Sequence, residues 1–572
     1  MDEKRKKTGF LRSLSQWRTK ALFIVFLIIS VAMLNRLYFL QIVRGDYYSA
    51  LALGQNIKVE NLPPRGNIYF QDKAGESRFL AAANKEVPFI YANPAEIEDE
   101  ENVLSILEGF IEFEEKERGV ILSRLFNKSS SYALIKKNIT EEQAKTITEL
   151  KIKGVYVKYE STRLYPAGQI ASHVLGFLGF EGDKRTGQYG VEESYEAILS
   201  GNPTNKFSLT GLFSDSVFEN SPSDIELTID YGAQFVVEKK LAELVSKLSA
   251  DSATAIFMDP KTGAIIVMAN YPEFDPNTYN KTEDLSIFNN LAVQSVFEPG
   301  SSFKPITISA AMDGGAVTSQ TTYEDTGSVS LSGYTIRNSD NQAHGIQTMT
   351  QVLEKSLNTG VIFAQQELGK KGFREYLENF GLDEKTQIDL PGEAENNMDN
   401  IKNTNRDINF ATASFGQGIS LTPMRLLASI SAIANNGVIM KPYVVKRITN
   451  GVRYADTEPK EMANPISSMT ASRLTTMMVS VVDNGFGSKA AVPGYSIAGK
   501  TGTAQVPDKE GSGYSSDTIH SFVGFAPAYN PQFAGIIKVD NPRGINFAAD
   551  SIAPVFGELA SFLLQYYKIP PQ

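Results

Sequence analysis

A serine and a lysine at helical spacing are the first residues of this sequence that could do chemistry. The segment 297–307 reads FEPGSSFKPIT and places Lys304 three residues after Ser301. Residues i and i+3 share one face of a helix, and a lysine base beside a serine can activate a nucleophile. Ser302 has Pro305 at that spacing and is not the candidate. Alone the pattern is weak, because Ser-x-x-Lys occurs by chance in many proteins.

Two later segments carry polar side chains at short spacing. In KSLNTG (355–360), the hydroxyl of Ser356 and the carboxamide of Asn358 fall on one side of an extended or loop segment. IAGKTGTAQV (497–506) is typical of a strand, with Gly502 where another backbone can approach closely. The neighbours of this glycine could together bind a carboxylate by charge and hydroxyl donors; they are Lys500, Thr501 and Thr503. Turn residues and a solvated edge lysine are the ordinary alternatives, but three such motifs in order are hard to attribute to chance.

Composition excludes several classes of chemistry. A chain of 572 residues is too long for one core, so two to four domains are expected. The absence of cysteine excludes disulfides, thiolate catalysis and cysteine-ligated metals. His173, His344 and His520 lie far apart in sequence, which argues against a His-rich metal site. A net charge of −10 argues against nucleic-acid binding.

The amino terminus predicts a membrane anchor. Residues 1–20 are basic, and the apolar segment 21–43 is long enough to cross a bilayer as a helix. Basic residues before the span predict a cytoplasmic amino terminus and an extracytoplasmic remainder. Arg36 lies near the far end, where its side chain could reach the interface. A cleaved signal peptide, with Ala-Leu-Ala at 50–52, and a buried soluble helix are the alternatives.

The rest of the chain changes character near residue 225. Before it, charged helical stretches alternate with turns, and 201–223 is rich in Gly, Ser, Asn and Pro, which predicts a hinge or loop. After it, the patterns predict an α+β domain of roughly 340 residues. Its first expected elements are a strand at 225–230, an amphipathic helix at 231–248 and a hairpin at 253–270 with its turn at 259–263.

The three motifs in this order resemble those of penicillin-binding proteins and serine β-lactamases. Further stretches resemble class B penicillin-binding proteins, the monofunctional D,D-transpeptidases of peptidoglycan synthesis. These stretches are RGNIYFQDKAG (65–75), RLYPAGQIASHVLGFLG (163–179), GQYGVEESYEAILSG (187–201), PKTGAIIVMANYPEFDPN (260–277), FGQGISLTPMRL (415–426) and HSFVGFAP (520–527). One departure follows Ile68. This sequence reads YFQDKAG at 69–75, whereas the family more often has an Asp-Arg pair before the glycine.

The resemblance implies a fold and a domain order. The fold would be α+β, with a single transmembrane helix, an elongated mixed α/β pedestal, and a transpeptidase domain whose antiparallel sheet is flanked by helices as in serine β-lactamases. The expected parts are a cytoplasmic tail (1–20), a transmembrane helix (21–43), a pedestal or dimerisation domain (44–224) and a transpeptidase domain (225–565).

The resemblance also implies a mechanism. Ser301 would attack the penultimate D-Ala carbonyl of a stem peptide and expel the terminal D-Ala, and a neighbouring stem-peptide amine would then complete the cross-link. Neutral Lys304 would be the base, with its pKa lowered by burial and by Lys500. Ser356 would relay a proton, and Asn358 would support Lys304 or the substrate amide. Lys500, Thr501 and Thr503, beside Gly502, would bind the terminal carboxylate. The N–H groups of Ser301 and Thr503 would form the oxyanion hole.

The expected partners follow from the same resemblance. They are donor and acceptor stem peptides, β-lactams that acylate Ser301, the cytoplasmic membrane, and other cell-wall or divisome proteins, among them a SEDS-type glycosyltransferase. No metal, organic cofactor or nucleic acid is expected. Overall length favours a role in division over one in elongation.

Four alternatives remain open. A β-lactamase would need a base that activates water, and Glu393 with Asn397 mimics the Glu-x-x-x-Asn pattern of such enzymes. That reading is disfavoured because a similar LPGE stretch is ordinary in class B proteins. A β-lactam sensor lacks a signalling domain here, an inactive scaffold conflicts with the intact motifs, and a bifunctional synthase would need a glycosyltransferase pattern.

Overall fold

The structure is a computed structural model of the chain. It describes residues 65–72, 77–182, 184–201, 221–507 and 513–571, together with Leu27, Ser30 and Met33. The predicted span at 21–43 therefore lies outside the described residues except for those three, which are helical, and most of the predicted loop at 201–223 also lies outside them. No helix in the described part of the chain is long and apolar enough to cross a membrane.

The chain divides into two compact units. Among the residues that the structure describes, the N-terminal unit contains 85–162 and the main unit contains those in 65–84 and 163–571. Strands β2 (Arg78–Ala92) and β4 (Val155–Leu164) contain residues of both. The boundary that we expect between 224 and 225 stays a prediction.

Strands and helices of the N-terminal unit enclose their own core. Strand β2 pairs with β3 (Ala133–Lys136) and β4, and helices α3 (Glu100–Glu108), α4 (Glu115–Leu125) and α5 (Glu141–Leu150) pack on them. Helix α5 begins at the cap Thr140, whose side chain accepts the N–H of Gln143 while Gln143 bonds back to the cap N–H. This reciprocal cap satisfies two of the N–H groups that a helix start leaves free.

Short elements that follow β4 bring distant segments of the main unit together. They are α6 (Ser172–Leu175), β5 (Phe177–Glu181), β6 (Lys184–Gln188), α7 (Gly190–Ser194) and α8 (Glu196–Ser200). Fully buried Glu192 of α7 accepts from Arg65 Nε at 2.7 Å and from Arg163 Nε at 2.8 Å. Arg65 also pairs with Glu196 at 2.7 Å. Two guanidinium groups thus hold the Glu192 carboxylate charged, and the pKa of Glu192 stays below its ordinary value despite the cost of burial.

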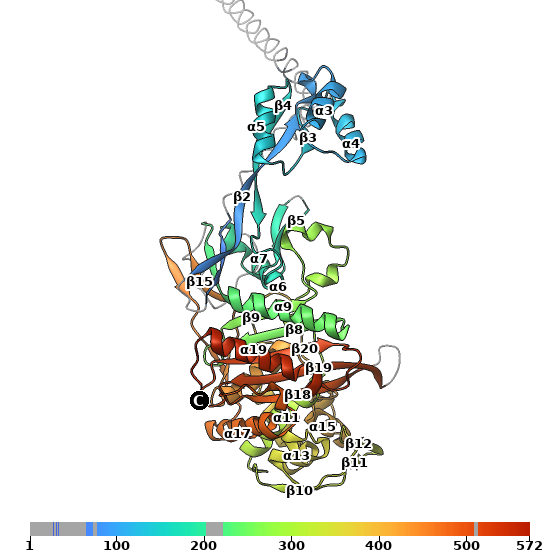
Figure 1. The fold of residues 1–572 in the computed structure, drawn as a ribbon, viewed down its shortest axis with the longest axis vertical. Coiled ribbons are helices and arrows are strands. Elements are labelled where there is room, and N and C mark those ends of the chain that lie inside the picture. The colour runs from blue at the N-terminus through green and yellow to red at the C-terminus, as the bar shows by residue number, and fades with distance from the viewer. Residues whose placement is uncertain are drawn as a thin grey trace, which may run out of the picture. The chain divides into compact units, whose positions relative to one another are not determined.

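A five-stranded antiparallel sheet forms the centre of the main unit (Figure 1). Its order is β18 (Ala498–Pro507), β19 (Tyr514–Ala526), β20 (Phe533–Asp540), β8 (Ser252–Met258) and β9 (Ile265–Tyr271). The last two strands confirm the predicted hairpin, whose turn contains Gly263 at φ +87°. Strand β18 is an edge strand, so alternate N–H groups along it have no partner strand.

Helices cover both faces of this sheet. Successive strand residues point to opposite faces, so Phe257 packs among residues of α9 (Tyr231–Leu248) and α19 (Ala553–Tyr566), whereas Ile256 packs on the other side. Helix α9 confirms the predicted helix to the residue. The predicted strand at 225–230 is β7 (Asp224–Asp230), which pairs with β1 (Ile68–Gln71) and β15 (Val445–Thr449) rather than with the five-stranded sheet.

The second face carries a helical region. Its helices are α10 (Leu291–Gln294), α11 (Lys304–Asp313), α12 (Met349–Glu354), α13 (Asn358–Asn379, broken at Gly369), α14 (Asp399–Lys402), α15 (Asp407–Ser414), α16 (Pro423–Ala434) and α17 (Ser468–Asn484). Two small ladders pair β10 (Thr322–Asp325) with β13 (Gly345–Thr348) and β11 (Ser328–Leu331) with β12 (Tyr334–Arg337). Helix α18 (Ala548–Ser551) lies against β18, and β16 (Tyr454–Asp456) pairs with β15.

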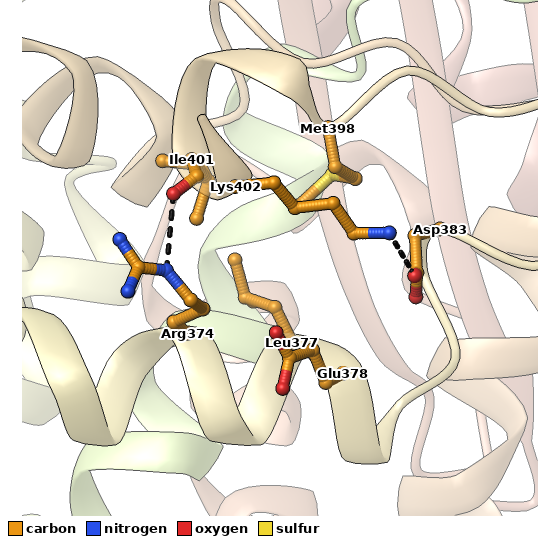
Figure 2. A pocket seen from close by; sticks show the side chains of 7 residues that line it. All are labelled: Arg374, Leu377, Glu378, Asp383, Met398, Ile401 and Lys402. Carbon is orange, nitrogen blue, oxygen red and sulfur yellow. Dashed lines mark hydrogen bonds and ion pairs between the residues drawn. The ribbon is translucent and has the colours of Figure 1, made fainter. Parts of the chain in front are cut away.

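A small hollow shows how α13 is tied to α14 (Figure 2). Arg374 of α13 donates from Nε to the carbonyl of Ile401 at 3.0 Å, and Lys402 forms an ion pair with Asp383. With a volume of about 10 Å³ the hollow has room for roughly one water molecule and none for an organic ligand. The contacts around this hollow therefore connect the two helices and bind no organic ligand.

We expect Glu192→Gln to lower the free energy of unfolding by about 3–5 kcal/mol at pH 7, because it takes the carboxylate from buried Arg163 and leaves buried Arg65 with Glu196 alone. Glu243→Gln, at a half-exposed carboxylate paired with Lys240, should cost less than about 1 kcal/mol. Urea denaturation followed by circular dichroism measures both. Equal costs in the two variants would contradict a stabilising role for the buried cluster.

Candidate functional site

Ser301 lies in a tight 3₁₀ turn, Gly300–Phe303, that leads into α11 at Lys304. Gly300 has φ +56°, and its N–H donates to the carbonyl of Gly416 at 3.0 Å. A Cβ on Gly416 would lie 2.3 Å from the carbonyl oxygen of Gly300, so the close approach requires glycine there. Ser302 is buried and donates to the carbonyl of Pro299 at 2.7 Å, which leaves Ser301 as the serine of this turn that reaches open space.

Two fully buried lysines meet at Ser356. Lys304 Nζ donates to the Ser356 carbonyl at 2.5 Å and to its Oγ at 3.3 Å. Lys500 Nζ donates to the same Oγ at 2.9 Å and to the carbonyl of Thr501 at 3.0 Å, with the Thr501 hydroxyl at 3.5 Å. Ser356 Oγ accepts from both lysines, so its own proton remains available to donate.

Burial makes charge costly at both lysines. Desolvation, with a further contribution from the charge of Lys500, holds the pKa of Lys304 well below its ordinary value. Desolvation lowers the pKa of Lys500 to about 7. Lys500 has three acceptors within reach, which matches the three N–H groups of an ammonium. Lys304 has two acceptors, which matches the two N–H groups of a neutral amine and leaves its lone pair free. The geometry thus favours a neutral Lys304 beside a charged Lys500.

The Ser-x-Asn motif adopts a tighter conformation than an extended segment. Ser356 has φ +55° in the connection between α12 and α13, and Asn358 is the first residue of α13. Asn358 Nδ2 donates to the carbonyl of Arg337 at 2.8 Å, and no hydrogen bond to Lys304 is found among the described residues. Of the two roles expected for Asn358, support of Lys304 is thus taken by Ser356, and support of the substrate amide stays a prediction.

The Lys-Thr-Gly-Thr segment lies on edge strand β18, in the strand conformation that the sequence predicts. A Cβ on Gly502 would lie 2.4 Å from Ser521 Oγ and 2.9 Å from the carbonyl of Pro299, so the glycine allows the nucleophile turn to pack on the strand. Thr503 Oγ1 accepts the N–H of Ala548 at 3.1 Å. This bond leaves the Thr503 hydroxyl proton free for another acceptor.

The motifs share one cleft of about 1070 Å³. Ser301, Ser356, Asn358, Thr501 and Thr503 all line it. Lys304 and Lys500 are fully buried behind this lining, at the hydroxyl of Ser356. The structure therefore brings together the residues that sequence analysis selected, although Ser301 Oγ makes no hydrogen bond to either lysine among the described residues. Such bonds commonly tighten only when substrate is bound.

Sequence reasoning missed much of the cleft lining. The missed residues lie at the end of β12 and just after it, in the loops after α15 and α17, and in the segment before α18, and include Arg337, Asn338, Phe415, Gln417, Phe486 and Phe547. Residues 415–426 carried the resemblance but had no role assigned. Asn338 is fixed by buried Asp325, which also accepts the hydroxyl of Thr359 at 2.8 Å. No local pattern marks such residues, because their approach depends on packing.

The alternative bases do not line this cleft. Glu393 Oε1 accepts the backbone N–H and the hydroxyl of Thr386, both at 2.6 Å, and its Oε2 accepts the N–H of Gln387 at 2.9 Å. His520 is buried and bonds Ser551 at 2.7 Å. Within the described part of the chain, no group of three or more His, Cys, Asp or Glu side chains could hold a metal ion.

Two known domain families match successive parts of this chain. Residues 253–561 match the penicillin-binding protein transpeptidase domain, and residues 60–208 match the penicillin-binding protein dimerisation domain.

Curated relatives match this chain over most of their own length. Stage V sporulation protein D of Bacillus subtilis is 33% identical over 568 residues, covering 96% of this chain and 85% of the relative. Peptidoglycan D,D-transpeptidase FtsI of Escherichia coli K12 is 29% identical over 580 residues, covering 97% and 92%. The chain therefore resembles these relatives over nearly its whole length.

Solved structures agree. Penicillin-binding protein 3 of Mycobacterium tuberculosis in complex with aztreonam is 30% identical, with a TM-score of 0.65 over 72% of this chain and 92% of that one. Penicillin-binding protein 2X of Streptococcus thermophilus, at 22% identity, shares the fold with a TM-score of 0.73 over 89% and 81%. The chain belongs to the class B penicillin-binding proteins, with the mixed α/β fold and the dimerisation and transpeptidase domains of that family.

Proposed function

We propose that this protein is a serine D,D-transpeptidase that cross-links peptidoglycan stem peptides. The observation that carries the proposal is the convergence of buried Lys304 and Lys500 on Ser356, in a cleft that Ser301 also lines. A neutral amine and an ammonium at one hydroxyl supply the base for acyl transfer from a peptide carbonyl and the positive charge that attracts the terminal carboxylate of that peptide.

The first half-reaction forms an ester on Ser301. Its proton passes to neutral Lys304 as Oγ bonds to the penultimate D-Ala carbonyl carbon, and the oxyanion is held by the N–H groups of Ser301 and Thr503. Thr501 and Thr503 hold the terminal carboxylate with their hydroxyls, Lys500 contributes its positive charge from behind them, and Gly502 allows the close approach. The C–N bond then breaks, and the departing D-Ala nitrogen takes the proton through Ser356. Asn358, which lines the cleft and donates to the Arg337 carbonyl, holds the substrate amide.

The second half-reaction exchanges ester for amide. An acceptor stem-peptide amine attacks the ester carbonyl and loses its proton through Ser356 to Lys304, and Ser301 Oγ leaves with a proton. β-Lactams acylate Ser301 by the first half-reaction. Their bound product blocks the cleft, and the tie of Glu393 to Thr386 and Gln387 supports slow hydrolysis of that product.

Labelling with a fluorescent penicillin tests the nucleophile. Wild-type protein should carry a stable label on Ser301, and Ser301→Ala should carry none, as measured by gel fluorescence and peptide mapping. Ser302→Ala is the matched control and should still be labelled. Label that disappears within seconds would indicate a β-lactamase, and an unlabelled folded wild type would indicate an inactive scaffold.

The pH profile of acylation tests the two lysines. We expect the second-order rate constant for penicillin acylation to fall at low pH, where Lys304 is protonated and cannot accept the serine proton. It should also fall as pH rises through about 7, where Lys500 loses its charge. Lys304→Arg should abolish acylation at every pH, because a guanidinium stays protonated. Lys500→Arg should retain weak activity without the alkaline decline, and a decline that persists in this variant would contradict the assignment.

We further propose that the segment 21–43 anchors the protein in the cytoplasmic membrane, with catalysis outside and a SEDS-type glycosyltransferase and other divisome proteins as partners in division. A fluorescent fusion of the full chain should fractionate with membranes and gather at the septum, and deletion of 21–43 should release it. A fusion spread along the lateral wall would instead indicate elongation. A membrane fraction unchanged by the deletion would contradict the anchor.

A further inference from the structure

Glu298 is a nearly buried carboxylate three residues before Ser301, and 8% of its surface is exposed. Its Oε1 accepts the N–H of Gly418 at 2.9 Å, and its Oε2 accepts the hydroxyl of Tyr514 at 3.0 Å. No cation pairs with it among the described residues, and desolvation raises its pKa. Burial of a carboxylate without a cation costs free energy, so we expect Glu298 to have a role at this position.

The two donors, Gly418 and Tyr514, belong to two different segments beside the cleft. Gly418 follows Gln417, which lines the cleft in the loop after α15. Tyr514 is the first residue of β19 and lies opposite Pro507 of β18, the strand that carries the lining residue Thr503. The backbone of Glu298 itself leads through Pro299 and Gly300 into the nucleophile turn. One side chain thus connects three segments that surround the reacting atoms.

We propose that Glu298 is a positioning residue for acyl transfer, which fixes the nucleophile turn against both the loop at 415–418 and the β18–β19 hairpin. The inference rests on the proposed function. The two oxyanion donors, the N–H groups of Ser301 and Thr503, come from the turn and from β18, so they converge on one oxygen only if these segments keep their spacing. Displacement by about 1 Å can reduce such a rate about 100-fold.

Penicillin acylation of the folded protein, with the maximal rate separated from the half-saturating concentration, tests this role. Glu298→Ala should lower the maximal rate about 10- to 100-fold with a smaller change in half-saturation, because reacting groups are misplaced more than binding is lost. Glu298→Gln should restore most of the rate, since its amide oxygen can accept from Gly418 and its amide nitrogen can donate to Tyr514. Tyr514→Phe, which keeps the bond to Gly418, should lower the rate less than Glu298→Ala does.

Two matched controls separate positioning from stability. Glu393→Ala removes a carboxylate that is also held by backbone N–H groups but does not line the cleft, and it should lower the melting temperature without slowing acylation. Tyr529→Phe alters an exposed tyrosine and should change neither quantity. Wild-type acylation rates in Glu298→Ala, or equal slowing in Glu393→Ala, would overturn the proposal.

Hydrogen exchange distinguishes this proposal from the proposed function. Backbone amides of 501–507 and 514–520 should exchange faster in Glu298→Ala than in wild type, and should not in Glu393→Ala. If Glu298→Ala exchanges faster in this way but penicillin fails to label the wild-type protein, the transpeptidase assignment is refuted. The connection through Glu298 is then still supported. Unchanged exchange in Glu298→Ala would refute that connection even if labelling succeeds.

Discussion

Two lysine side chains removed from water, Lys304 and Lys500, share the hydroxyl of Ser356, and the chemistry of the cleft depends on this arrangement. Two adjacent ammonium groups repel each other, and burial penalises each, so one of the pair can be neutral near physiological pH. The same lysines on a solvated surface would both be charged, and neither could accept a proton from a serine. Burial therefore turns an ordinary cation into a base.

Keeping those lysines dry requires the two layers that meet at β18. Lys500 lies on this edge strand and Lys304 begins α11, while Ser356 occupies the left-handed connection between α12 and α13. Glycines make the contacts possible, since a side chain at Gly416 or Gly502 would strike the nucleophile turn. The active site is thus a packing result as much as a set of reactive groups.

The ionic cluster around Glu192 illustrates the same dependence at a distance from the cleft. Arg65, Arg163 and Glu192 come from three separate stretches of sequence, and each stretch by itself only resembles the family. A buried carboxylate between two guanidinium groups is stable only when all three segments are folded together. No one of these three segments therefore predicts the cluster by itself, but the formed cluster holds the three segments together in the main unit.

The sequence by itself determined the elements and the reactive residue types. Periodicity and turn residues predicted α9 and the β8–β9 hairpin, and the three motifs selected Ser301, Lys304, Ser356, Asn358 and the segment at 500–503. Only the tertiary structure decided that Asn358 bonds the Arg337 carbonyl instead of Lys304, that β7 leaves the five-stranded sheet to pair with β1, and that Glu298 joins three segments. Motifs and periodicity depend on neighbours along the chain, whereas hydrogen-bond partners and desolvation depend on segments that meet only in the fold, here residues between 21 and 216 positions apart.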